Sequence, residues 1–168
     1  DQKVDQRSGV SQRLPISCLE NVVSNAEHRA LVNKETDVVA RVTDIYAALP
    51  SITGKFELEY EGELKGVDNV ARALIQTSVR NVFDGWFEGV NTNLIVEWFE
   101  MGGTLQISDT STAEELIEAV NNIQGLEELL KHVGIVAKDS PSMVAAAIDF
   151  VFQGLYAEKK ISRTVENE

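Results

Sequence analysis

An apolar stripe between Gly66 and Phe87 constrains the fold more than any other feature of the sequence. Its members recur every three or four residues, which is the period of an α-helix with one buried face. We therefore predict a long helix over 66–87 that forms the spine of the second half of the chain. Its predicted inward residues are Val67, Val70, Ala71, Leu74, Val79, Val82, Phe83 and either Trp86 or Phe87.

An amphipathic helix is also predicted near the beginning of the chain. Its apolar face is made of Leu19, Val22, Val23, Ala26 and Ala30. Ser17 and Glu20 match a capping box, whereas Ser11 marks an earlier start that would place Pro15 in the first turn. The sequence pattern alone does not decide between these two starts of the helix.

Five further helices are expected from their caps or spacing. Val42-Thr43-Asp44 begins a short helix with Thr43 as its cap and Pro50 near its end. Thr92 caps the next helix, a capping box formed by Thr112 and Glu115 starts another, and Ser140-Pro141 starts the last. The predicted inward residues, with those of a helix near 126–133, are Ile45, Ala48, Leu49, Leu94, Ile95, Trp98, Phe99, Leu116, Ile117, Val120, Leu126, Leu129, Leu130, Val133, Met143, Val144, Ala147, Ile148, Val151, Phe152 and Leu155.

Two short segments alternate apolar and polar residues instead. Phe56–Glu61 is predicted as an edge strand with a carboxylate-lined wet face, and Thr104–Ser108 as a strand that pairs with it. The carboxylates line up along the strand, so a solvated face explains them better than a cation site does. The sequence therefore predicts a mainly α fold with at most one short β hairpin.

The charge balance excludes several classes of partner. The 168 residues contain 15 Lys and Arg against 27 Asp and Glu, a formal net charge of −12. Such a surface repels nucleic-acid phosphates and acidic membranes. A single cysteine, Cys18, is expected to be a buried thiol, and no apolar run approaches the ~18 residues of a membrane span. These features predict a cytoplasmic location with neither nucleic-acid nor membrane binding.

Arg13 is the strongest candidate for a functional side chain. The run from Gly9 to Ile16 joins a glycine turn, the capping hydroxyl of Ser11, this arginine and a helix. An arginine carried at a helix start can meet a terminal phosphate, because its guanidinium is always charged and offers a fixed fork of donors. From the spacing alone, a surface or salt-bridging arginine is the better explanation, and only the family resemblance described next reverses this preference.

The motif Gly9-x-Ser11-x-Arg13 before a helix, followed by Lys34–Ile45 opening a second helix, resembles the lid subdomain of ATPases of the MoxR and magnesium-chelatase type. The resemblance implies an AAA+ lid-type helical bundle over residues 7–52 and a helical carboxy-terminal extension over 53–163. It implies that Arg13 is the catalytic sensor-2 residue that contacts ATP. It also implies that Ser11 and Gly9 are the adjoining cofactor-binding positions, although a capping role for Ser11 and backbone freedom at Gly9 explain these two residues better. Arg7 and Arg41 are secondary candidates for a phosphate.

The same resemblance implies a longer parent protein. Its ATP- and magnesium-binding core would lie upstream of Asp1, it would form a ring with neighbouring subunits, and hydrolysis would remodel a protein partner or insert a metal. This chain itself has no P-loop, because Gly54-Lys55 is followed by Phe56, and no Walker-B segment. We therefore expect the fragment alone to be inactive and to hold no ATP or Mg²⁺.

Other candidate sites have simpler explanations. Asp109–Ala113 resembles the metal motif of integrin-type domains, but Ala113 replaces its last serine and helix capping explains Ser111 and Thr112. His28 and His132 have no second ligand at metal-binding spacing, and the aromatic residues at 86, 87, 98 and 99 fit core packing. The alternative function is an acidic helical protein-interaction module without a nucleotide role.

Overall fold

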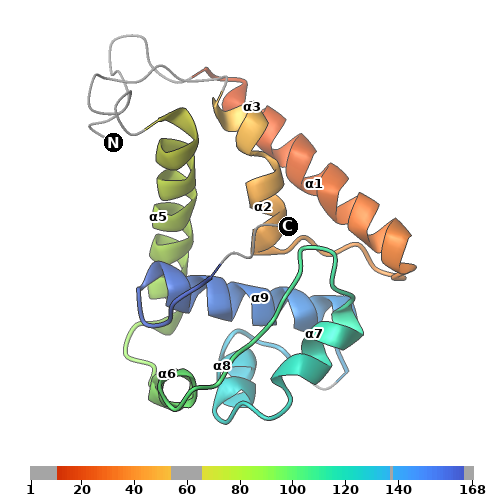
Figure 1. The fold of residues 1–168 in the computed structure, drawn as a ribbon. Helices are drawn as coiled ribbons and strands as arrows, with labels where there is room; N and C mark the ends of the chain where they lie inside the picture. The colour runs from red at the N-terminus through yellow and green to blue at the C-terminus, as the bar shows by residue number, and fades with distance from the viewer. Residues whose placement is uncertain (1–10, 54–65, 137, 165–168) are drawn as a thin grey trace.

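The fold is mainly α-helical. The computed structural model describes residues 11–53, 66–136 and 138–164, and in these ranges it contains eight α-helices and no β-strand (Figure 1). The helices are α1 (Leu14–Asn33), α2 (Val42–Ala47), α3 (Leu49–Thr53), α5 (Val67–Phe87), α6 (Asn93–Glu100), α7 (Ala113–Val120), α8 (Leu126–His132) and α9 (Pro141–Ala157).

Helices α5 and α9 cross and form the frame of the molecule (Figure 1). At the crossing, the ring of Phe83 lies so close to Gly154 that a Cβ added there would be 2.0 Å from the ring carbon Cδ2. Phe83 also stacks on Phe87, with ring centroids 4.5 Å apart, and meets the edge of Phe150. Glycine at 154 is therefore required for the close approach of the two helices.

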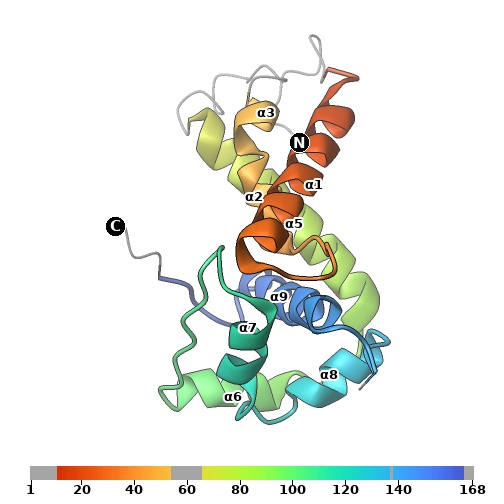
Figure 2. The same cartoon turned by 90° about the vertical axis from the view of Figure 1, so that its right-hand side faces the viewer.

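Two apolar clusters lie on this frame. The larger one joins the end of α5 to α6, α7, α8 and α9, and the smaller one joins the start of α5 to α1, α2 and α3 (Figures 1 and 2). Val79 belongs to the smaller cluster and Phe83, one turn later, to the larger, so α5 is shared by both. The fully buried members of the larger cluster include Phe83, Ile95, Leu116, Ile148, Val151 and Leu155; the smaller contains Ala48, Leu49, Ile52, Ala71, Ile75 and Val79.

Several helix boundaries are confirmed. The long helix runs over Val67–Phe87, and the last begins with Pro141 directly after Ser140. The capping box of α7 is formed, since the N–H of Glu115 donates to Thr112 Oγ1 at 3.1 Å and the N–H of Thr112 donates to Glu115 Oε2 at 2.9 Å.

The predicted strand at Thr104–Ser108 is wrong. The segment is extended without a ladder, yet Leu105 and Ile107 are partly buried against the larger cluster and the residues between them are exposed. The alternation of apolar and polar residues therefore arises because this segment lies along the surface of the larger cluster. It does not indicate a β-strand. The other predicted strand, Phe56–Glu61, lies outside the described residues.

The predicted cap Thr43 is also wrong. Helix α2 is preceded by Arg41, whose N–H donates to Asp44 Oδ2 at 2.7 Å, while the N–H of Thr43 donates to Asp149 Oδ2 of α9 at 3.0 Å. Carboxylates thus satisfy the first amides of α2. Pro50 lies in the first turn of a separate helix, α3.

Six of the residues predicted to point inward are exposed. In α1 the predicted residues Ala26 and Ala30 are buried, whereas Leu19 and Val23 lie in solvent. The predicted apolar stripes of α1 and α5 are therefore wider than the sides that are buried. The wrongly predicted residues are Leu19, Val23, Val67, Val82, Leu94 and Met143; of the alternatives Trp86 and Phe87, Phe87 is the buried one.

Candidate functional site

Arg13 lies directly before the first turn of α1. Helix α1 begins at Leu14 with Arg13 as its N-cap and Pro15 in its first turn. The start is therefore close to the earlier of the two predicted starts, although Ser11 does not cap the helix. The N–H of Arg13 approaches Ser11 Oγ at 3.3 Å, and the N–H of Leu14 donates to Ser11 O at 2.9 Å. The Arg13 side chain is exposed and makes no ion pair with the other described residues. Gly9 and Arg7 lie outside those residues, so the three-residue motif is only partly described.

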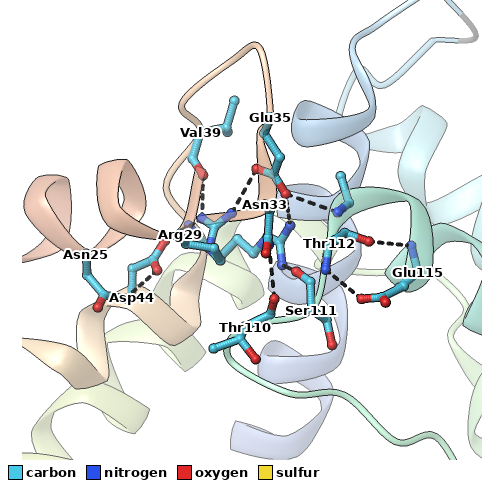
Figure 3. A network of polar contacts seen from close by, with 12 residues as sticks. Asn25, Arg29, Asn33, Glu35, Val39, Asp44, Thr110, Ser111, Thr112 and Glu115 are labelled. Carbon is cyan, nitrogen blue, oxygen red and sulfur yellow. Dashed lines mark hydrogen bonds and ion pairs between the residues drawn. The ribbon is translucent and has the colours of Figure 1, made fainter. Parts of the chain in front are cut away.

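Beneath α1 lies a buried polar network that the sequence pattern does not predict (Figure 3). Arg29, on the inner side of α1, donates from Nη2 to Asp44 Oδ2 at 2.9 Å and to the carbonyl of Val39 at 2.9 Å. Its Nη1 lies 3.2 Å from Glu35 Oε2. Asp44 is 1% exposed and also accepts from Asn25 Nδ2 at 2.8 Å. The inner side of α1 is thereby fixed to the chain that follows it.

A second half of the network joins this region to α7. Arg41 donates from Nη1 to the carbonyl of Ser111 at 2.7 Å, and its Nη2 lies 3.3 Å from Glu35 Oε1. The same carboxylate oxygen accepts the N–H of Ala113, the first residue of α7, at 3.1 Å. Nearby, Asn33 Nδ2 donates to the carbonyl of Thr110 at 3.0 Å (Figure 3). A glutamate at a helix N-terminus is stabilised by the helix dipole as well as by the hydrogen bond.

The network is almost wholly buried, and the Nε atoms of Arg29 and Arg41 have no hydrogen-bond partner in it. Two arginines face two carboxylates, and Arg29 and Arg41 are each 4% exposed. Burial, followed by repulsion from Arg29, lowers the pKa of Arg41. Arg41 was a secondary candidate for a phosphate, but its guanidinium is committed to Ser111 and Glu35. The arrangement holds α1 in place, and we assign it a structural role.

Asp149 is expected to make the stability of the fold depend on pH. Its carboxylate is buried in α9 and accepts the N–H of Thr43; the side chain of Gln153 and the charge of Arg41 also face it. Burial raises the pKa of Asp149 above its ordinary value of 3.8 despite these partners. Folding therefore favours the protonated acid, and this contribution to stability is complete below 3.8 and is lost as the pH rises through the folded-state pKa.

The variant Asp149→Asn keeps an acceptor for Thr43 but does not titrate. The free energy of unfolding of the wild type, relative to this variant, is expected to fall between pH 3.8 and neutrality. Urea unfolding curves of both proteins across this range measure the difference. A difference that stays constant, or rises with pH, would contradict the assignment of a raised pKa to Asp149.

The outer side of α1 carries a row of exposed apolar residues. Ile16, Leu19, Val23 and Leu31 are 60%, 64%, 42% and 79% exposed. At 3.6 residues per turn they fall within about a third of the helix circumference and span about 22 Å of its length. Glu20 and Glu27 lie along the same strip and are exposed. We call these six residues the α1 face; the helix that carries it lies at the edge of the molecule (Figures 1 and 2).

The other residues that the sequence suggested as possible sites have structural roles or no described partner. Ser111 and Thr112 cap the turn before α7, and the described residues hold no group of three or more side chains suited to a metal ion. His132 Nε2 lies 2.8 Å from the carbonyl of Trp86, whereas His28 is simply exposed. Burial raises the pKa of the Cys18 thiol, which is only partly buried beside the smaller cluster.

Comparisons with known proteins place this chain in no family: no family model, curated protein or solved structure matches it. Among the described helices, none has both the length and the apolar character needed to cross a bilayer.

Proposed function

We propose that this chain is a protein-interaction module that uses the α1 face to hold a helix of a partner protein. The observation that carries the proposal is the row of four large apolar side chains left in solvent along one helix. Burying each side chain of this size contributes about 1.5–3 kcal/mol, and exposed apolar residues gathered on one face mark interaction surfaces. Isolated exposed residues, such as Met101, need no such explanation.

The rigidity of α1 supports the proposal. The Arg29 network and the contacts with α2 and α3 fix the inner side of the helix, so the outer side is presented in one orientation. A surface that is already ordered loses less conformational entropy when a partner binds. The exposed face is therefore preorganised for a complementary helix.

Site-specific photo-crosslinking in cells that express the protein tests the proposal. A photoreactive amino acid at Leu19 or Val23 is expected to give one discrete adduct with another protein, because both side chains would lie inside the interface. The same amino acid at His28, an exposed position on another side of α1, is the matched control and should give much less of that adduct. Equal yields at all three positions, or no adduct with another protein, would rule out the α1 face as the interface.

The alternative is the nucleotide-sensing lid, and one observation favours it. Arg13 is exposed at the start of α1 and forms no ion pair within the described part of the chain, as a phosphate-sensing arginine requires. In this alternative the chain is the lid and helical extension of a magnesium-chelatase-like ATPase. ATP and Mg²⁺ would be held by the upstream core, and Arg13 would add one contact to the terminal phosphate.

Arg13→Ala tests this alternative in a longer protein that carries a P-loop upstream of this chain. ATP hydrolysis is expected to fall at least about tenfold, since one charged contact to the transferred phosphate is lost. Arg72→Ala, which removes an exposed arginine from α5, is the control and should leave turnover unchanged. Equal turnover of the two variants, with circular dichroism spectra like that of the wild type, would exclude the sensor role.

A further inference from the structure

Resting on the interaction module proposed above, we infer that the occupant of the α1 face is a basic amphipathic helix. Its apolar residues would pack on Ile16, Leu19 and Val23, and its lysines or arginines would lie beside Glu20 and Glu27. A partner of this class would match both the apolar and the charged residues of the α1 face.

The two glutamates are placed for this role. They are seven residues apart, so they lie almost above one another on α1 and about 10 Å apart along its axis. Both are exposed, and neither makes an ion pair with another described residue. A helix packed along α1 repeats its side chains with nearly the same period, and charged residues that flank an apolar seam select the partner. Cations at this repeat would meet both carboxylates at once.

The same charges disfavour a second copy of the chain. An antiparallel pair of α1 helices centred on Val23 would place Glu20 of each copy next to Glu27 of the other. A parallel pair would place each glutamate beside its own counterpart. Like charges in such positions are destabilising, and the net charge of −12 adds a general repulsion between copies. A cationic partner converts the same carboxylates into favourable contacts and accelerates its own association.

A pair of synthetic helical peptides provides the probe. Both have leucine at the seam positions of three heptads; one has lysine and the other glutamate at the flanking positions. Fluorescence anisotropy with each labelled peptide, at a concentration where the peptide is monomeric, measures its affinity for the whole chain. The lysine peptide is expected to bind at least tenfold more tightly than the glutamate peptide, and more weakly as salt is raised.

Two double variants separate docking on the α1 face from general attraction to an acidic protein. Leu19→Glu with Val23→Glu makes the chain more negative but removes the apolar contacts, and it is expected to weaken binding of the lysine peptide at least tenfold. Glu20→Lys with Glu27→Lys keeps the apolar residues and is expected to reverse the preference between the peptides. Since all four side chains are exposed, both variants should keep the melting temperature of the wild type.

The outcomes distinguish this inference from the proposed function. Equal or tighter binding of the lysine peptide by the more acidic variant, or an unchanged preference in the lysine variant, would overturn the inferred charge class. If crosslinking at Leu19 succeeds in cells while the peptides bind equally, the interaction module stands and the basic partner falls. Crosslinks to a second copy, or to another part of the same chain, would overturn the inference directly.

Discussion

Replacing Asp44 by alanine is expected to lower the free energy of unfolding by about 3–5 kcal/mol, the usual cost of removing one partner from a buried ion pair. Asp44 accepts from Arg29, from Asn25 and from the N–H of Arg41, and it is 1% exposed. Its loss leaves the buried guanidinium of Arg29 with less compensation and removes the carboxylate that satisfies the amide before α2. Urea unfolding followed by circular dichroism measures the change.

Two comparisons make this result specific. Asp84→Ala removes a carboxylate that lies 3.7 Å from Arg80 on the surface of α5, and it should change the free energy of unfolding by less than about 1 kcal/mol. Combining Asp44→Leu with Arg29→Met removes both charges, and should recover part of the loss because no unpaired charge remains. A loss for Asp44→Ala no larger than that for Asp84→Ala would show that the network is solvated.

Gly154→Ala is expected to destabilise the fold by about 2 kcal/mol. The new methyl group would lie 2.0–2.6 Å from ring atoms of Phe83, which is itself 1% exposed and packed against Phe87. Overpacking of this kind costs about 1–3 kcal/mol or more, and the gain of about 1 kcal/mol from helix propensity does not offset a contact this close. The melting temperature and the urea midpoint should both fall.

Gly85→Ala is the matched control, because it makes the same chemical change in the neighbouring helix. Nothing lies within 4 Å of the position where its Cβ would be. Only the helix propensity then changes, and the variant is expected to be more stable than the wild type by about 0.5–1 kcal/mol. The two variants are therefore expected to change the free energy of unfolding in opposite directions. If both variants are stabilised, α5 and α9 do not approach as closely at Gly154 as described.

The sequence predicts best those elements whose signals are local. The start of α9 follows from a proline in its first turn, and the start of α7 from the capping box of Thr112 and Glu115. The spine helix α5 is predictable because its apolar stripe is long enough for the helical period to be unambiguous. The start of α1 could be restricted to two positions, and the observed start at Leu14 lies between them, nearer the earlier one.

The orientation of α1 could be predicted only in part. Ala26 and Ala30 of the predicted stripe are buried, but Leu19 and Val23 at its edge are exposed, because contacts with α2 and α3 decide how wide the buried side is. The buried network of Arg29, Arg41, Glu35 and Asp44 could not be predicted from the sequence either. Charged residues are expected at the surface, and nothing in the spacing of Arg29 and Asp44 shows that they pair in the interior. The role of Arg13 stays a prediction, although its place before α1 agrees with the expected helix start.

Because both apolar clusters share α5, binding of a partner at one cluster should affect the stability of the other. Val79 and Phe83 are one turn apart on a continuous helix, yet each is an integral part of a different cluster. Opening of the middle of α5 would remove packing contacts from both clusters at once. Amide protons in the two clusters should therefore exchange with solvent through one cooperative opening. A partner that binds α1 is therefore expected to slow the hydrogen exchange of backbone amides in α8, although it makes no contact with α8.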